Sequence, residues 1–235
     1  MKFAIIAAGE GSRLAQEGVS LPKPLVRLAG EPMIDRLLRI FNACGAEEIV
    51  LIVNTLAPEA EQHIRSLQAE GRAGNVRLVV KTTPSSMHSF SELSPYLSDA
   101  PFCLTTVDTV FREEEFRQFI DEFRASESDG LLAVTDFIDD EKPLYVGTDS
   151  NLRVTGFYDT PQPAVRYISG GIYALRPRAL QTLYRCMAEG QSRMRNFQRG
   201  MIADGLYLQA RPFSKILDVD HAADIRKAEE FLRTP

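Results

Sequence analysis

Two positively charged residues, Arg13 and Lys23, follow closely on a glycine-rich turn near the start of the chain. They lie in the stretch AAGEGSRLAQEGVSLPKPL, which runs from Ala7 to Leu25. Backbone N–H groups of such a turn can surround an anion, while an arginine can hold a phosphate through two parallel hydrogen bonds. Lys23, between Pro22 and Pro24, adds a second positive charge. The stretch therefore predicts a site for a phosphorylated ligand.

Two familiar phosphate-binding patterns fit this turn poorly. The dinucleotide-binding pattern G-x-G-x-x-G can start at Gly9 and Gly11, but Leu14 stands at its third glycine. The P-loop pattern needs a lysine directly after its last glycine, and Gly11 is followed by Ser12 and Arg13. An NAD-dependent oxidoreductase and a P-loop protein are therefore disfavoured. Taken without their cationic neighbours, the glycines are better explained by an ordinary turn.

The elements that must position this turn can be read from the apolar pattern. The run from Phe3 to Ile6 predicts a buried strand over residues 2–8, which places the turn at the strand's carboxyl end, where open α/β sheets bind ligands. Further strands are expected over residues 48–53, 76–81, 102–106, 130–134, 167–175 and 206–210. Because these runs are nearly continuous in apolar residues, the sheet should be covered on both faces.

Helical spacing of apolar residues predicts helices between these strands. We expect helices over residues 32–44 and 58–70, one ending near 97 after a loop at 82–91, and others opening at Glu113, Pro177, Met194 and His221. The pattern of residues 136–160 instead predicts a hairpin of two short strands around an Asp-Ser-Asn turn. The predicted fold is a single α/β domain over residues 1–235, doubly wound around a mostly parallel, Rossmann-like sheet, with a small β-hairpin extension.

Composition narrows the class of protein. The 235 residues carry a net charge of −5 without a long block of either sign, so neither nucleic acid nor a membrane surface is an expected partner. Cys44, Cys103 and Cys186 fall in apolar segments without metal-ligand spacing, which indicates buried reduced thiols. Neither a signal peptide nor a membrane span is recognisable. We therefore expect a cytoplasmic protein, and the sequence specifies no oligomeric state.

The glycine turn and the PKP segment together resemble a family signature. The runs AAGEGSRL and LPKPL are similar to the pattern G-x-G-x-R-(L/M) followed by P-K-(P/A)-(L/M) of the nucleoside-diphosphate-sugar pyrophosphorylases, or sugar-1-phosphate nucleotidyltransferases. Three later stretches match that family in order: TTVDTVF with Asp108, SGGIYAL with Gly171, and ILDVDHAADIRKAEEFL with Asp218. The resemblance thus spans nearly the whole chain and implies the nucleotidyltransferase variant of the Rossmann-like fold.

The resemblance implies a chemistry as well as a fold. Members of the family transfer a nucleotidyl group from an NTP to a phosphorylated small-molecule acceptor, usually a sugar 1-phosphate, with Mg²⁺ as cofactor and pyrophosphate as leaving group. The attacking phosphate is already ionised at neutral pH, so catalysis needs alignment and charge neutralisation rather than a general base. The nucleotide-binding half would be about residues 1–135 and the acceptor-binding half about residues 136–235.

Individual roles follow from the same resemblance. The NTP would lie on the turn, with Arg13 stabilising the departing pyrophosphate and Lys23 holding the α-phosphate or the acceptor phosphate. Asp108 and Asp218 would carry Mg²⁺, and Asp220, two positions further along an extended segment, would be an additional ligand. Backbone and side-chain contacts to the nucleotide would come from Ala8, Gly9, Gly11, Ser12 and Ser89.

Several of these residues have structural alternatives. Asp108, Asp218 and Asp220 could each cap a following helix, and Ser89 could belong to a solvated loop or cap rather than read the nucleobase. His63 and His221 are predicted to be structural rather than catalytic.

Two departures from the family pattern concern the acceptor. The Glu-Lys-Pro motif, whose lysine contacts the sugar phosphate, is replaced by GFYDTPQP, and the Tyr-Gly-Val-Val strand is replaced by residues 143–146, PLYV. Acceptor contacts are therefore assigned to Gly171 and Arg166, with Arg195 as an alternative to Arg166. The acceptor could also be a phosphoalcohol such as phosphocholine, used by a cytidylyltransferase. A catalytically silent regulatory relative is the remaining class, although it would be expected to lack Arg13, Lys23 or a metal-binding aspartate.

Overall fold

A parallel four-stranded unit forms the first half of the sheet in the computed structural model, which describes residues 1–139 and 141–233. Its strands are β1 (Lys2–Ala7), β4 (Ile49–Val53), β5 (Val76–Val80) and β6 (Phe102–Thr106). They lie in the order β6-β1-β4-β5, and every neighbouring pair is parallel. Their carboxyl ends therefore meet along one edge, as the apolar runs predicted.

The second half of the sheet is built around β11 (Tyr167–Leu175), which runs antiparallel to β6. It also pairs with β8 (Gly130–Thr135), and β8 pairs in parallel with β12 (Leu208–Phe213). The hairpin expected over residues 136–160 is confirmed as β9 (Tyr145–Thr148) and β10 (Val154–Tyr158), which extend the edge of the same sheet. The described residues thus form one nine-stranded sheet.

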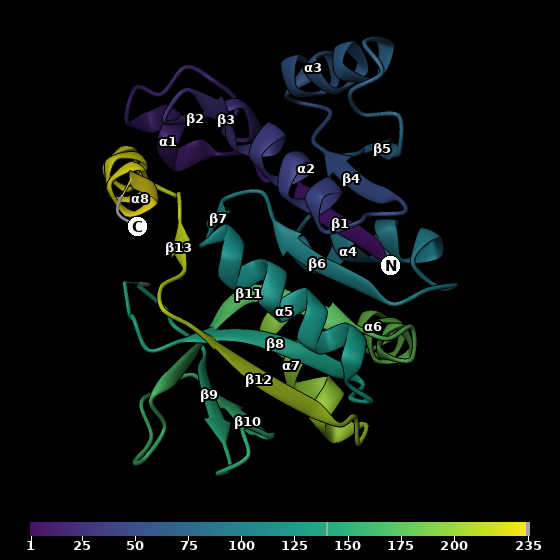
Figure 1. Cartoon of the computed structure of the whole chain (residues 1–235), viewed down its shortest axis with the longest axis vertical. Coiled ribbons are helices and arrows are strands. Elements are labelled where there is room, and N and C mark those ends of the chain that lie inside the picture. The colour runs from purple at the N-terminus through teal and green to yellow at the C-terminus, as the bar shows by residue number, and fades with distance from the viewer. Residues whose placement is uncertain (140, 234–235) are drawn as a thin grey trace.

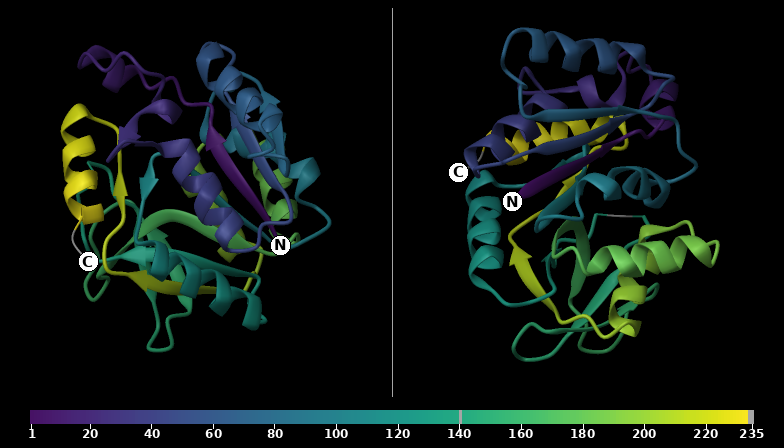
Figure 2. Two further views of the ribbon diagram at one scale, coloured as in Figure 1. Left: turned by 45° about the horizontal axis from the view of Figure 1, so that its top comes forward. Right: turned by 90° about the vertical axis from the view of Figure 1, so that its right-hand side faces the viewer.

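Helices cover both faces of this sheet (Figures 1 and 2). One face carries α2 (Met33–Ala43), α3 (Pro58–Ala69), α5 (Glu113–Ala125) and α8 (Ala222–Arg233). The other carries α4 (Ser86–Leu93), α6 (Ala179–Ala188) and α7 (Met194–Ala203). The shorter elements are α1 (Ser12–Gln16), η1 (Lys23–Leu25), β2 (Arg27–Leu28), β3 (Glu31–Pro32), η2 (Ser94–Tyr96), β7 (Thr109–Val110) and β13 (Leu217–Asp218). No helix in the described part of the chain is long and apolar enough to cross a membrane.

Alternation along β1 shows why the fold is doubly wound. Phe3 and Ile5 face the hydrophobic cluster under α2, α3 and α5, whereas Ala4 and Ile6 face the cluster under α4, α6 and α7. All four side chains are buried. A central strand buried on both sides is nearly continuous in apolar residues, which is the pattern from Phe3 to Ala7.

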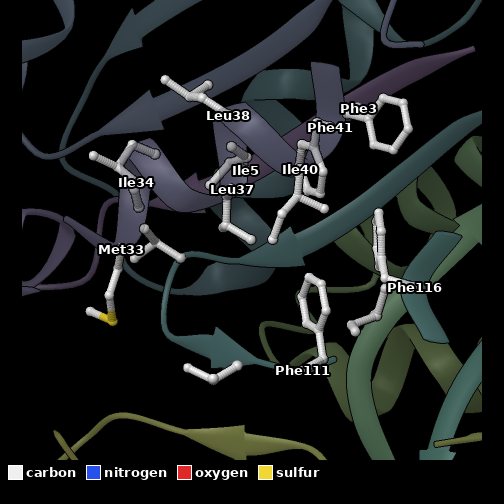
Figure 3. Close-up of a cluster of buried hydrophobic side chains, with 14 of the residues drawn as sticks. Phe3, Ile5, Met33, Ile34, Leu37, Leu38, Ile40, Phe41, Phe111 and Phe116 are labelled. Carbon is white, nitrogen blue, oxygen red and sulfur yellow. The ribbon is translucent and has the colours of Figure 1, made fainter. Parts of the chain in front are cut away.

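Stacked phenylalanine rings hold α2 and α5 on the first face (Figure 3). The ring centroid of Phe116 lies 5.4 Å from that of Phe41 and 4.7 Å from that of Phe111. Phe41 in turn stacks on Phe3 of the central strand at 4.6 Å. All four rings are essentially inaccessible to solvent. Because aromatic pairs contribute beyond their buried area, this stack is a main support of the fold.

Two element boundaries differ from the sequence expectation. The loop expected over residues 82–91 is shorter, because the hydroxyl of Ser85 accepts a hydrogen bond from the backbone N–H of His88 and α4 already begins at Ser86. The last strand of the sheet, β12, runs to Phe213 rather than to residue 210, because its parallel pairing with β8 continues to Thr135. The three cysteines are buried and free, as predicted.

The chain returns to its N-terminal half after β12 (Figure 1). There β13 pairs with β7, with Asp218 opposite Thr109, and α8 contacts β2. Gly170 permits this return, because a Cβ at that position would lie only 2.2 Å from Cδ1 of Ile216. The neighbouring Gly171 adopts a positive φ of 71°, where glycine is favoured. Gly170 therefore allows the C-terminal segment to lie directly on the sheet.

The phenylalanine stack gives a stability prediction. Replacing Phe116 with alanine removes a ring buried among other rings, so we expect the free energy of unfolding to fall by about 3–5 kcal/mol in urea titrations. Tyr184→Ala is the control: this ring on α6 is 47% exposed, and its loss should cost about 0.5 kcal/mol or less. Equal costs for the two variants would contradict the importance of the stack.

Candidate active site

A buried lysine lies between two carboxylates at the carboxyl edge of the parallel strands. The ammonium group of Lys23 donates a hydrogen bond to Asp108 and another, 2.5 Å long, to Oδ1 of Asp220. The second oxygen of Asp220 accepts a hydrogen bond from Arg13 at 3.3 Å. The structure therefore brings together four of the residues that the sequence singled out, from positions up to 207 residues apart.

Each member of this cluster is positioned by a short element. Arg13 lies on α1 directly after the glycine turn, and Lys23 begins the single 3₁₀ turn η1. Asp108 lies between β6 and β7, and Asp220 follows β13. Besides the pairing of β13 with β7, the backbone N–H of Val219 donates to the carbonyl of Asp108 at 3.1 Å. That bond fixes the two acidic segments relative to each other.

The charges in the cluster stabilise one another. Burial disfavours the charged form of Lys23, whose side chain is 11% exposed, but the two carboxylates more than offset this, so the pKa of Lys23 lies above its ordinary 10.5. Burial alone would raise the pKa of Asp220. The hydrogen bond from Lys23 and its positive charge instead hold that pKa below 3.8. Lys23 and Asp220 are therefore both ionised at neutral pH.

The glycine turn is shaped by the approach of Lys23. Gly11 has a positive φ of 62°, and a Cβ there would lie 3.1 Å from the Cβ of Lys23. The turn is also held by Asn54, which sequence analysis did not assign to the site. Its amide donates to the carbonyl of Ala8 at 2.9 Å, and its oxygen accepts from the hydroxyl of Thr82 at 2.7 Å. The sequence feature that could have indicated this role is a polar residue directly after the fully buried β4.

Two cavities meet at the cluster. The first, of about 310 Å³, we call the Ser89 cavity, and its walls include Ala8, Gly9, Lys23, Ser89 and Asp108. The second, of about 490 Å³, we call the Asp218 cavity, and its walls include Arg13, Ser169, Gly170, Arg195, Asp218, Asp220 and His221. Lys23 and Asp108 thus border one cavity, and Arg13 and Asp220 border the other. Two ligands could meet across this boundary.

The remaining predicted residues divide between the cavities and the surface around them. Ser89 is buried and shares a 2.6 Å hydrogen bond with the hydroxyl of Thr83 in its cavity. Ser12 is exposed at the start of α1 and lines neither cavity. Gly171 faces Thr109 at the bulge of β11, and its neighbour Gly170 lines the Asp218 cavity instead.

The two candidate arginines on the acceptor side lie differently. Arg166 is exposed, pairs with Asp136 at 3.0 Å and lies over the ring of Tyr167, so it lines neither cavity. Arg195 lines the Asp218 cavity, where it pairs with Asp159 at 2.5 Å. Of the two alternatives, only Arg195 is therefore within reach of a ligand in that cavity.

His221 connects the turn region to α8. Its Nδ1 shares a 2.6 Å hydrogen bond with Glu17, whose other oxygen accepts from the backbone N–H of Ala222 at 2.6 Å. The hydrogen bond to Glu17 raises the pKa of His221 above 6.5. Because Glu17 caps α1, this link fixes the helix that carries Arg13 against the start of α8.

The donor set suits a magnesium ion that is shared with phosphates. Oδ1 of Asp108 is buried and receives no hydrogen bond from the described residues. Within those residues, no group of three or more His, Cys, Asp or Glu side chains gathers to hold a metal ion. Mg²⁺ in phosphoryl-transfer sites commonly takes one or two carboxylates, with phosphate oxygens and water completing its shell. Asp108 and Asp220 fit that arrangement, whereas Asp218 is exposed.

The α/β sheet carries a glycine turn, two cationic side chains and two aspartates at its strand ends. This combination is typical of proteins that bind nucleotides. The chain belongs to the family of MobA-like NTP transferase domains, whose model matches residues 3–205. The family resemblance inferred from the sequence motifs is thereby confirmed.

Curated relatives and solved structures agree with this assignment. The chain is 27% identical over 189 residues to a mannose-1-phosphate guanyltransferase of Hypocrea jecorina, covering 78% of this chain and 51% of the relative. It is 25% identical over 224 residues to mannose-1-phosphate guanylyltransferase 1 of Arabidopsis thaliana, covering 90% and 59%. The chain spans about half the length of the curated relatives it matches.

Two solved structures share the fold over their full length. A putative glucose-1-phosphate thymidylyltransferase from Bacillus anthracis, solved with a sucrose, has a TM-score of 0.85 at 17% identity, covering 100% of this chain and 96% of that one. The inositol-1-phosphate CTP transferase from T. maritima has a TM-score of 0.78 at 19% identity, covering 99% and 96%. At these identities the likeness establishes the α/β fold class that the sequence predicted.

The conformation of the glycine turn can be tested by a pair of variants. Gly11→Ala forces a side chain into the left-handed region and against Lys23, so we expect a loss of about 1–2 kcal/mol in the free energy of unfolding. Gly9→Ala is the matched control, because no atom lies within 4 Å of a Cβ placed there. Its stability should be unchanged within about 0.5 kcal/mol. Similar losses in both variants would show that Lys23 does not restrict the turn.

Proposed function

We propose that this chain transfers a nucleotidyl group from an NTP to a phosphorylated small molecule, in the first place a sugar 1-phosphate, and releases pyrophosphate. The observation that carries the proposal is the cluster of Lys23, Asp108, Asp220 and Arg13 at the boundary of two cavities. A two-substrate transfer needs two pockets that meet at cationic groups. The names of the curated relatives support a sugar 1-phosphate as acceptor.

The proposed reaction uses the cavities in a fixed arrangement. The nucleotide occupies the Ser89 cavity with its α-phosphate at Lys23, and the acceptor occupies the Asp218 cavity with its phosphate near Arg13. An oxygen of the acceptor phosphate attacks the α-phosphorus, and a new P–O bond forms. The bond from the α-phosphorus to the bridging oxygen breaks, and pyrophosphate leaves with the electron pair. Alignment and positive charge supply the catalysis.

Asp108 and Asp220 are the pair that we propose for holding Mg²⁺ with the phosphates. Both carboxylates accept a hydrogen bond from the ammonium group of Lys23, whereas Asp218 is exposed on the wall of the Asp218 cavity. The ion would supply positive charge against the phosphate oxygens. When phosphates replace the carboxylates as partners of Lys23 and Arg13, Lys23 becomes available to the α-phosphate and Arg13 to the phosphate of the acceptor. Asp218 then takes a place on the acceptor side.

A cytidylyltransferase for a phosphoalcohol is the second candidate, favoured by the exposed position of Arg166 and by the missing Glu-Lys-Pro lysine. A catalytically silent relative is disfavoured, because Arg13, Lys23, Asp108 and Asp220 are all in place. Because NTPs are cytoplasmic metabolites, we also propose that the protein acts in the cytoplasm.

The reaction is tested by incubating the protein with the four NTPs, Mg²⁺ and a panel of mannose 1-phosphate, glucose 1-phosphate, inositol 1-phosphate and phosphocholine, and measuring pyrophosphate. Arg13→Ala and Asp108→Asn should each lower turnover about a hundredfold or more, because Arg13 contacts a reacting phosphate and Asp108 is proposed to hold the Mg²⁺ that neutralises the phosphates. Arg65→Ala, an exposed arginine on α3, should leave turnover unchanged. Absence of pyrophosphate from the wild-type protein with every pair would reject the proposal.

A second pair of variants assigns the metal ligand. We expect Asp220→Ala to lose about a hundredfold in turnover and to need more Mg²⁺ for half-maximal rate, and Asp218→Ala to lose less than about tenfold. Removal of the metal with EDTA should abolish turnover, and added Mg²⁺ should restore it. A larger loss of turnover in Asp218→Ala than in Asp220→Ala would assign the metal ligand to Asp218.

A further inference from the structure

The side-chain amide of Asn54 holds one peptide group of the glycine turn. Asn54 directly follows β4 and is only 2% exposed. Its nitrogen donates a 2.9 Å hydrogen bond to the carbonyl of Ala8, and its oxygen accepts one of 2.8 Å from the backbone N–H of Leu56. Because a backbone carbonyl can only accept and a backbone N–H can only donate, these two partners allow the amide a single orientation. The nitrogen of Asn54 therefore faces Ala8.

Asn54 also connects two walls of the Ser89 cavity. The hydroxyl of Thr82 donates to the oxygen of Asn54 at 2.7 Å and shares a further hydrogen bond with Thr55. Thr82 precedes Thr83, which forms one wall of the cavity, and Ala8 belongs to the opposite wall. Asn54 is buried behind both walls and fixes the turn relative to the ends of β4 and β5.

Fixing the carbonyl of Ala8 also fixes the direction of the N–H group that follows it. The peptide bond between Ala8 and Gly9 is trans, so its oxygen and its N–H point in opposite directions. Since the oxygen is directed to Asn54, the N–H of Gly9 is directed away from Asn54. Gly9 lines the Ser89 cavity, and its N–H donates to no other group in the described part of the chain. This N–H is therefore available to an anion in the cavity.

The turn by itself does not secure this direction. Rotation of the peptide group changes ψ of Ala8 and φ of Gly9, and glycine adopts either sign of φ at little cost. The rotated group would turn the oxygen of Ala8 toward the cavity in place of the N–H of Gly9, and that oxygen would repel a phosphate. The hydrogen bond from Asn54 opposes the rotation, because the bond would be lost in the rotated form.

We propose that Asn54 is a positioning residue of the nucleotide site: by holding the carbonyl of Ala8, it presents the N–H of Gly9 to the phosphates of the NTP. The proposal rests on the proposed nucleotidyl transfer and assigns the preorganisation of its phosphate side to a residue that touches neither substrate. Because Asn54 acts on the phosphates and not on the nucleobase, its loss weakens the binding of an NTP and of inorganic tripolyphosphate alike.

Isothermal titration calorimetry without an acceptor measures this role in the absence of turnover. Asn54→Leu keeps the size of the side chain but removes its donor, so the Kd of the tightest-binding NTP should rise about tenfold, as expected for one lost hydrogen bond to an ionised ligand. The Kd of inorganic tripolyphosphate should rise by the same factor. Asn75→Leu is the matched control, because this amide donates to the carbonyl of Ala46 at 3.2 Å at the opposite end of β5. Both Kd values should be unchanged in it.

Thr82→Val separates the positioning of the turn from general support of the same network. It removes one partner of Asn54 but leaves the bonds to Ala8 and Leu56, so both Kd values should change less than about threefold. In turnover assays Asn54→Leu should raise the KM for the NTP and leave the KM for the acceptor unchanged. Thermal unfolding shows whether each variant is folded, and Asn54→Ala takes the place of Asn54→Leu if the latter is not.

The amide proton of Gly9 gives the most direct readout. In NMR spectra of the wild-type protein its resonance should move downfield when inorganic tripolyphosphate is added, and this shift should be lost in Asn54→Leu. Unchanged Kd values in the folded Asn54 variant, equal rises in Thr82→Val or Asn75→Leu, or a rise for the NTP without one for tripolyphosphate would overturn this proposal alone. Absence of pyrophosphate from the wild-type protein with every substrate pair would instead reject the nucleotidyl transfer on which it rests.

Discussion

The pairing of the Lys23 ammonium with Asp108 and Asp220 is the interaction on which the site depends. Desolvation would favour a neutral amine if the carboxylates were absent, and the carboxylates would repel each other if the lysine were absent. The three groups come from the beginning, the middle and the end of the chain. The ionised forms of Lys23 and Asp220 therefore stabilise each other only when the segments that carry them are in place.

The sheet meets this requirement through the direction of its strands. The parallel β1 and β6 deliver the glycine turn and Asp108 to the same edge. The antiparallel β11 then lets the chain come back below that edge, and its Gly170 leaves room for the segment that leads to Asp220. The pairing of β13 with β7 and the backbone hydrogen bond from Val219 to Asp108 bring the C-terminal acid to the lysine.

Local patterns in the sequence were sufficient for much of this architecture. Continuous apolar runs predicted the parallel strands, and the glycines before Arg13 predicted the turn at the carboxyl end of β1, whose binding of phosphate stays a prediction. Local patterns do not give the pairing register of distant strands. From the sequence, either Asp218 or Asp220 could face Lys23. The pairing of β13 with β7 decides that Asp220 does. Asn54 was missed for a related reason, because the role of its buried amide depends on partners distant in sequence. A side-chain cap likewise started α4 earlier than its apolar pattern suggested.

The hydrogen bond between Lys23 and Asp220 joins residues 197 positions apart, and that separation bears on how the protein folds. Closing so long a loop is entropically costly, and contacts of high sequence separation form late in folding. The parallel half of the sheet can pair its strands from neighbouring segments, whereas the two cavities acquire their common boundary only after the C-terminal segment has docked. A chain in which that segment has not docked lacks the boundary between the two cavities. Completion of the fold and formation of that boundary are consequently the same event.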